Sequence, residues 1–241
     1  GMKSSASWFG KNWEVRTTKF GEGTEYVAKV DVQKIATGEQ TMEYDSYDVD
    51  TYRHGTTITI KNLNRRMTNN VFKRSKVYLE SIYRNDISGG KIKITVNDDE
   101  LFWEGFEDSI LVEQQTGKKY KKQINFDVNG KTVDGWVAVL SNGSREKAGF
   151  SQMRHGRVIQ GYPDAWRPSS IFGQDSGSNT LINQRLVGEL NFDQWDEVAH
   201  TKNEIIFSPD EEEKIEDELK KQSQEYIRVA EQYRKGPSPK G

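Results

Sequence analysis

The pair Asn129-Gly130 constrains the fold most, because it separates two long runs of β-type residues. An Asn-Gly pair readily adopts the positive φ angles that a two-residue hairpin turn requires. The runs on either side of it, 121–128 and 131–140, are each long enough for one strand of a sheet. We therefore predict an antiparallel hairpin at this point.

Several other segments also have the pattern of a strand. Residues 24–35 place Tyr26, Ala28, Val30 and Val32 at every second position, which is the period of a strand with one buried face. A Gly21-Glu22-Gly23 turn separates this segment from residues 11–18, which we also predict as a strand. The remaining predicted strands are 56–60, 91–96, 100–103, two short strands within 148–159, and 184–193.

Helical patterns occur twice, at residues 70–84 and 209–235. The second helix has a clear start signal, because Ser208 can cap it, Pro209 suits its first position and Glu211 can close a capping box. At 1.5 Å per residue this helix would be roughly 40 Å long. Residues 161–182 are predicted as a long loop with one short helix near 169–172. Together these elements predict an α+β fold of two subdomains joined near residues 85–90.

Composition excludes several classes of protein. The 241 residues include 6 Trp, 10 Tyr and 10 Phe, enough to fill small cores although only 33% of the chain is hydrophobic. The sequence has no cysteine, so disulfides and thiol nucleophiles are excluded, and it has no apolar run long enough to cross a membrane. We expect a cytoplasmic protein with no membrane partner. The three histidines are too far apart in sequence for a local zinc motif, and we predict no metal site.

The net charge of −2 means that any binding to nucleic acid must depend on local patches. Two basic runs are candidates for contacts with phosphates; they comprise Arg65, Arg66, Lys73, Arg74 and Lys76, and Lys118, Lys119, Lys121 and Lys122. The alternative is that both runs are solvated faces, which we favour. Phe72 and Tyr120 are the only aromatic residues within them, too few for a platform on which single strands stack.

Four short motifs occur in an order that resembles the GHKL ATPase superfamily, which includes gyrase B, histidine kinases, the ninety-kilodalton heat-shock chaperone, MutL and the microrchidia proteins. Residues 2–5 resemble the end of the family's glycine-rich G2 box, and residues 54–63 resemble its late Gly-Thr strand. Residues 148–159 are similar to a microrchidia-type strand pair. Gly188-Glu189-Leu190 followed by Thr201-Lys202 resembles the transducer segment that carries a catalytic lysine.

The resemblance implies the remnant of a Bergerat-type α/β sandwich, followed by a transducer domain of ribosomal-protein-like α+β fold and a long C-terminal helix. It implies domains at 1–88, 89–208 and 209–241. Lys202 would reach the γ-phosphate as the catalytic residue. Lys3, Ser4 and Ser5 would bind phosphates at a helix N-terminus, and one hydroxyl of the pair Thr56 and Thr57 would lie in the floor of the nucleotide pocket.

The family's metal-binding Glu/Asn box and its D-x-G-x-G motif precede the G2 box and do not occur in this sequence. We therefore expect a piece of a longer protein that binds ATP and Mg²⁺ with the missing N-terminal segment, and no cofactor on this chain alone. By itself the chain is not expected to hydrolyse ATP. A homodimer is also implied, and DNA stays open as a partner. The alternative function is a non-catalytic α+β scaffold that binds protein or nucleic acid.

Overall fold

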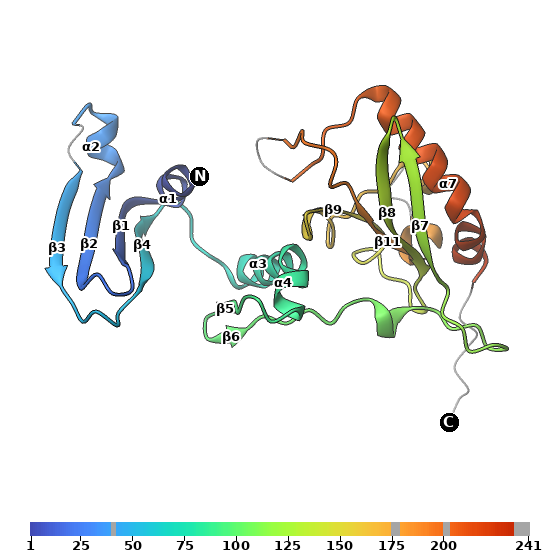
Figure 1. The fold of residues 1–241 in the computed structure, drawn as a ribbon, viewed down its shortest axis with the longest axis horizontal. Coiled ribbons are helices and arrows are strands. Elements are labelled where there is room, and N and C mark those ends of the chain that lie inside the picture. Colours follow the sequence, from blue (N-terminus) through green and yellow to red (C-terminus); the bar gives the residue numbers. More distant parts are fainter. Residues whose placement is uncertain (40–41, 175–178, 200–202, 234–241) are drawn as a thin grey trace. The chain divides into compact units, whose positions relative to one another are not determined.

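The computed structural model describes residues 1–39, 42–174, 179–199 and 203–233. The chain forms two compact units, Gly1–Val71 and Phe72–Gly241, and each combines a sheet with helices (Figure 1). The α+β fold class is therefore confirmed. No helix within the described residues is both long and apolar enough to cross a membrane.

The first unit is built on a four-stranded antiparallel sheet in the order β3-β2-β1-β4. Its elements are α1 (Met2–Phe9), β1 (Gly10–Thr18), β2 (Thr24–Asp31), α2 (Val32–Ala36), β3 (Glu43–Asp48) and β4 (Gly55–Leu63). The strand predicted over 24–35 ends early, at Asp31, because the carboxylate of Asp31 accepts the backbone N–H groups of Gln33 and Lys34 and caps α2.

Helix α1 packs on one face of this sheet. Ala6 of α1 is buried with Trp13 of β1 and Val30 of β2, and the Trp13 indole N–H donates to the Ser7 hydroxyl at 3.1 Å. The turn from helix to strand needs a glycine, because a Cβ atom at Gly10 would lie 2.5 Å from both Ile60 Cγ2 and the Lys61 carbonyl oxygen. These contacts hold α1 against β1 and β4.

The second unit contains a five-stranded sheet in the order β10-β9-β11-β8-β7. Its strands are β7 (Lys121–Val128), β8 (Lys131–Val139), β9 (Gly149–Arg154), β10 (Arg157–Gln160) and β11 (Leu186–Asn191). Strand β11 runs parallel to β9 and antiparallel to β8. The predicted hairpin is confirmed as β7–β8, since Asn129 and Gly130 both have positive φ and Val128 pairs with Lys131.

Helix α3 (Asn69–Ile82) starts three residues before the second unit and continues into it, and α4 (Arg84–Ser88) follows. A two-residue ladder of β5 (Thr95–Val96) and β6 (Asp99–Glu100) follows, shorter than the hairpin predicted for 91–103. The predicted short helix at 169–172 is confirmed as α5 (Ser169–Phe172). The remaining elements are a 3₁₀ turn at Glu107–Ser109, α6 (Ile182–Arg185) and α7 (Pro209–Gln232).

Both faces of the second sheet are covered. On one face, Ile215, Leu219 and Tyr226 of α7 pack with apolar side chains of β7, β8, β9 and β11. On the other face, Phe106 and Ile110 of the segment after β6 pack on strands β8 and β11. This sheet therefore carries the main core of the chain.

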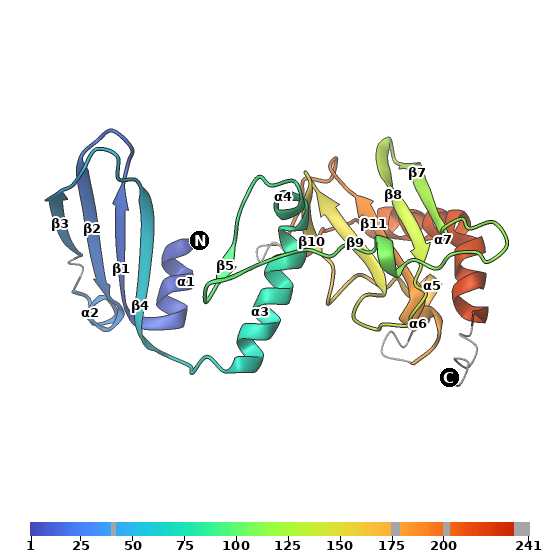
Figure 2. The same ribbon diagram turned by 90° about the horizontal axis from the view of Figure 1, so that it is seen from below.

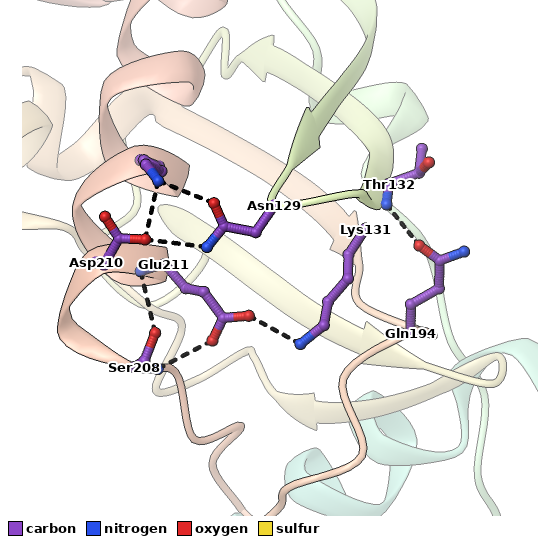
Figure 3. A network of polar contacts seen from close by, with 8 residues as sticks. Asn129, Lys131, Thr132, Gln194, Ser208, Asp210 and Glu211 are labelled. Atoms are coloured by element: carbon purple, nitrogen blue, oxygen red, sulfur yellow. Dashed lines mark hydrogen bonds and ion pairs between the residues drawn. The ribbon is translucent and has the colours of Figure 1, made fainter.

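The start of α7 is fixed by the capping box that the sequence predicts (Figure 3). The Ser208 hydroxyl accepts the backbone N–H of Glu211 at 3.3 Å, and the Glu211 carboxylate accepts the backbone N–H of Ser208 at 3.1 Å. Lys131, beyond the β7–β8 turn, forms an ion pair with Glu211 at 2.8 Å. Asn129 of the same turn donates to Asp210 at 3.0 Å. The hairpin turn and the helix start thus hold each other in place.

The boundary between the compact units lies at residues 71 and 72, whereas the sequence places a domain boundary at residue 88. Burial explains the difference, because Ser81 and Arg84 are almost fully buried. Arg84 pairs with Glu189 of β11, so α4 is packed on the second sheet. The helices after β4 therefore belong with the second unit.

Candidate functional site

The residues predicted to bind a nucleotide in the first unit lie on α1 and β4. Trp13 is opposite Ile60 in the β1–β4 pairing, and both belong to the cluster beneath α1. Side chains alternate along a strand, so Thr56 shares the face of Ile60 while Thr57 points to the opposite face. Of the two predicted threonines, only Thr56 therefore lies on the face that carries α1.

Thr56 is the second residue of β4 and is exposed. Its hydroxyl is 2.8 Å from the hydroxyl of Thr17, the residue opposite it on β1. The apolar surface beside it is only partly covered, because Tyr26 is 48% exposed and Ile58 is 43% exposed. A polar group thus stands at the end of an exposed apolar face of the sheet.

The N-terminal end of α1 points toward the end of the sheet at which Thr56 lies. The last turn of α1 leads directly into β1. This turn lies near the C-terminal end of β4, because the side-chain amide of Asn64, the residue after β4, donates to the Trp8 carbonyl oxygen at 2.8 Å. The first turn of α1 therefore lies away from the C-terminal end of β4, and the helix runs beside that strand (Figure 2). Lys3, Ser4 and Ser5 lie in its first turn and are exposed. Helix N-termini favour anions because their backbone N–H groups have no partners within the helix.

The catalytic lysine predicted from the sequence, Lys202, lies outside the described residues. The strand that precedes it in the chain, β11, is at the centre of the second sheet. Gly188 of that motif is required by close packing, since a Cβ atom there would lie 2.5 Å from the Trp136 carbonyl oxygen and 2.6 Å from Phe150 Cδ1. The motif therefore has a structural reason for its glycine, independent of any role for Lys202.

The strand pair predicted around 154–156 is confirmed as the hairpin β9–β10. Arg154 pairs with Asp196 at 2.9 Å, and the guanidinium of Arg157 stacks 5.4 Å from the centre of the Tyr83 ring. Both arginines therefore have contacts within the second unit.

The second basic run is largely occupied by contacts within the chain. Lys119 and Lys121 both form ion pairs with Glu107, and Lys121 also lies over the Trp136 ring. Lys122 donates to the carbonyl oxygen of Gln222 at 3.3 Å. Lys118 is exposed.

The first basic run is divided between the two units. Arg65 and Arg66 are exposed in the segment after β4, and Lys73 and Arg74 are exposed on α3. Lys76 forms an ion pair with Asp99 at 2.5 Å. The pattern of charged residues in the sequence did not distinguish the exposed basic side chains from the ion-paired one, Lys76.

Sequence reasoning missed the most strongly buried charge among the described residues, Arg84. Its side chain is 1% exposed and forms an ion pair with Glu189 at 2.6 Å. Burial lowers the pKa of Arg84, while the charge of Glu189 opposes that shift. The guanidinium also lies over Trp103 and Phe106, at 5.2 and 5.8 Å from the ring centres. The one signal in the sequence for this contact is that Arg84 follows apolar positions of a helical pattern. That signal is not specific, because a solvent-exposed arginine can have the same neighbours.

Within the described part of the chain, no three side chains of the metal-binding types lie close enough together to hold a metal ion. His54 is exposed beside Phe20, and the His155 ring nitrogen is 4.0 Å from Asp193.

Comparisons with solved structures give matches of low sequence identity. The chain is similar to the ATPase region of topoisomerase II from Saccharomyces cerevisiae, with 11% identity, a TM-score of 0.46, and coverage of 92% of this chain and 61% of that one. It is similar to the B subunit of DNA gyrase from Myxococcus xanthus, with 10% identity, a TM-score of 0.44, and coverage of 94% and 70%. The N-terminal domain of a DNA repair protein matches with 13% identity, a TM-score of 0.47, and coverage of 93% and 74%.

The chain spans only about three fifths of the length of the topoisomerase II region. Its sequence matches no family model and no curated protein.

Proposed function

We propose that this chain is the later part of an ATP-binding module of the GHKL type, followed by a transducer domain with a microrchidia-like hairpin at β9–β10. The observation that carries the proposal is the geometry of the first unit. The N-terminal end of α1 and the hydroxyl of Thr56 share one face of the antiparallel sheet, and that face is open beside them. The order of the sequence motifs supports the same function.

In this proposal each part has a separate physical role. The unpaired N–H groups at the start of α1, with Lys3, Ser4 and Ser5, attract phosphate oxygens. Thr56 offers a hydroxyl to the nucleotide, and the exposed apolar face around Ile58 offers a surface on which its apolar part can pack. Bound Mg²⁺ would neutralise phosphate charge, and its ligands would come from the segment that precedes this chain. Lys202 would stabilise the negative charge that develops on the γ-phosphate during transfer.

We further propose that ATP turnover drives a conformational change through the transducer domain, coupled to association of two copies of the protein. The alternative, a scaffold that binds nucleic acid, is less favoured. Lys119, Lys121 and Lys122 are held by contacts within the chain, so their charges are less available to phosphates.

The opposite orientations of Thr56 and Thr57 give a test with an internal control. Thr56→Val and Thr57→Val remove one hydroxyl each from neighbouring positions of β4 and keep the β-branched shape. In the protein expressed with its upstream coding sequence, Thr56→Val should weaken binding of a non-hydrolysable ATP analogue about two- to tenfold, the usual effect of one lost hydrogen bond.

Thr57→Val should leave the affinity unchanged, because its side chain points away from the α1 face. Calorimetric titration measures both. Equal affinities for the two variants, or a loss confined to Thr57→Val, would contradict the proposed site.

A further inference from the structure

A groove on the second unit has aromatic walls and an acidic rim. It is formed by α3, by β6 and the segment that follows it, by the loop between β8 and β9 and by the turn after β10. Its lining side chains are Glu80, Glu100, Phe102, Trp103, Glu104, Lys147 and Tyr162. The Trp103 and Tyr162 rings are 5.9 Å apart and tilted by 57°. Phe102 is 69% exposed, so its ring is accessible at the edge of the groove.

Three of the four carboxylates around this groove have no basic partner among the described residues. Among the described residues, no basic side chain lies within ion-pair distance of Glu80, Glu104 or the adjacent Glu146. Glu100 alone is paired, with Lys93 at 2.5 Å. Burial raises the pKa of the Tyr162 hydroxyl, and the charges of Glu146, Glu80 and Glu104 raise it further. The three unpaired carboxylates therefore lie close enough to act on the same ring, and Lys147 is the one cation among the lining residues that the structure describes.

Trp103 packs against two neighbouring side chains in the wall of the groove. Arg84 lies 5.2 Å from the centre of its ring, and Phe106 packs against it edge to face at 5.5 Å. The charge of Arg84 is balanced by Glu189, so the groove carboxylates are not its counter-ions. A wall that is ordered before binding costs less entropy when a ligand enters.

We propose that this groove is a docking site for a basic side chain, lysine or arginine, from an exposed segment of a protein partner. The argument is charge complementarity. Aromatic faces attract cations, and the unpaired carboxylates would supply the counter-charge. The cavity of about 270 Å³ is slightly smaller than those that hold drug-sized ligands, and it suits one long side chain. Its acidic rim repels nucleic acid.

The test uses two fluorescent decapeptides that differ only at four positions, which are lysine in one and glutamine in the other. Fluorescence anisotropy with the full chain should show binding of the lysine peptide, weakened by salt, and no measurable binding of the glutamine peptide. Phe102→Ala and Glu104→Gln should each weaken the lysine peptide about two- to fivefold, as expected for exposed cation–π and ionic contacts. The double variant should weaken it about tenfold.

Matched control variants test whether a loss of peptide affinity comes from the groove itself. The alternatives are a change in net charge or the loss of any exposed aromatic ring. Phe20→Ala and Glu22→Gln remove an exposed aromatic ring and an exposed carboxylate from the first unit, and neither should change the affinity. Thermal unfolding followed by circular dichroism checks that all variants are folded.

Three results would overturn the proposal. The first is equal affinity for the two peptides. The second is an equal loss of affinity in the control variants. The third is a dimer in sedimentation experiments that Glu104→Gln dissociates, because the cation would then come from a second copy of this chain.

Discussion

Arg84 shows how one side chain can decide to which unit an element belongs. Its guanidinium is removed from water and forms one close ion pair, with Glu189, and two of its nitrogens, Nε and Nη1, have no hydrogen-bond partner among the described residues. A buried charge is tolerated only with a partner, so α4 must stay where Glu189 can reach it. Sequence patterns could not show this, because they do not reveal which of many arginines is buried.

Loss of the Arg84 guanidinium should destabilise the second unit. Arg84→Met keeps an apolar side chain and leaves Glu189, 21% exposed, with the Trp136 indole N–H at 3.1 Å as its one side-chain donor among the described residues. We expect the free energy of unfolding to fall by about 3 kcal/mol, at the low end for breaking a buried pair because Glu189 can reach water. Urea unfolding followed by tryptophan fluorescence measures the change.

Two variants calibrate that measurement. Arg53→Met removes a 59% exposed arginine from Glu25, which keeps Arg16 as a partner at 3.1 Å, and should cost less than about 1 kcal/mol. Glu189→Gln in the Arg84→Met background should recover part of the loss, because the unpaired charge is then gone. If Arg84→Met costs no more than Arg53→Met, the pair does not hold α4 on the sheet.

At the scale of elements, local signals of backbone chemistry predicted most of what the structure contains. The Asn129-Gly130 turn and the Ser208 capping box both occur where the sequence places them, since their geometry depends on a few adjacent residues. Strand β2 ends four residues before the predicted position, because Asp31 caps a helix that the alternating pattern concealed. Residues 91–103 form only a two-residue ladder.

The start of α7 should depend on pH in a defined direction. Lys131 holds the pKa of Glu211 below its ordinary value of 4.5, and Asn129 with Lys214 holds the pKa of Asp210 below 3.8. A lowered pKa in the folded state stabilises the fold at pH values above the ordinary pKa, and this contribution is lost as pH falls through the lowered value.

Glu211→Gln should therefore destabilise the chain at pH 7 by more than at pH 3. Thermal unfolding of both proteins at the two pH values measures the difference. Glu213→Gln is the control, because Glu213 lies on the exposed side of the same helix and should show little dependence on pH. Equal losses for Glu211→Gln at pH 7 and pH 3 would show that the ion pair with Lys131 does not stabilise the helix start.

At the scale of the whole molecule, the α+β class could be predicted, and the compact units divide at residues 71 and 72 whereas the sequence places a domain boundary at residue 88. The class follows from counting strand and helix patterns along the chain. The boundary depends on non-local contacts, because the buried guanidinium of Arg84 reaches Met153 of β9 and Glu189 of β11, both more than 60 residues later in the sequence. The residues of the candidate site could be proposed from the sequence, but their orientations could not, because these depend on how the strands pair. The sequence identified Thr56 and Thr57 together, and only the register of β4 with β1 distinguishes them.

The most direct measurement of the central claim is ATP turnover by the protein expressed with its upstream coding sequence, with and without the Lys202 amine. The account predicts that Lys202→Ala binds the ATP analogue normally and loses about 100-fold or more of the turnover rate, because one group that stabilises developing charge is removed. Lys118→Ala, which removes an exposed lysine, should keep full activity. Unchanged turnover by Lys202→Ala with normal binding would contradict the account.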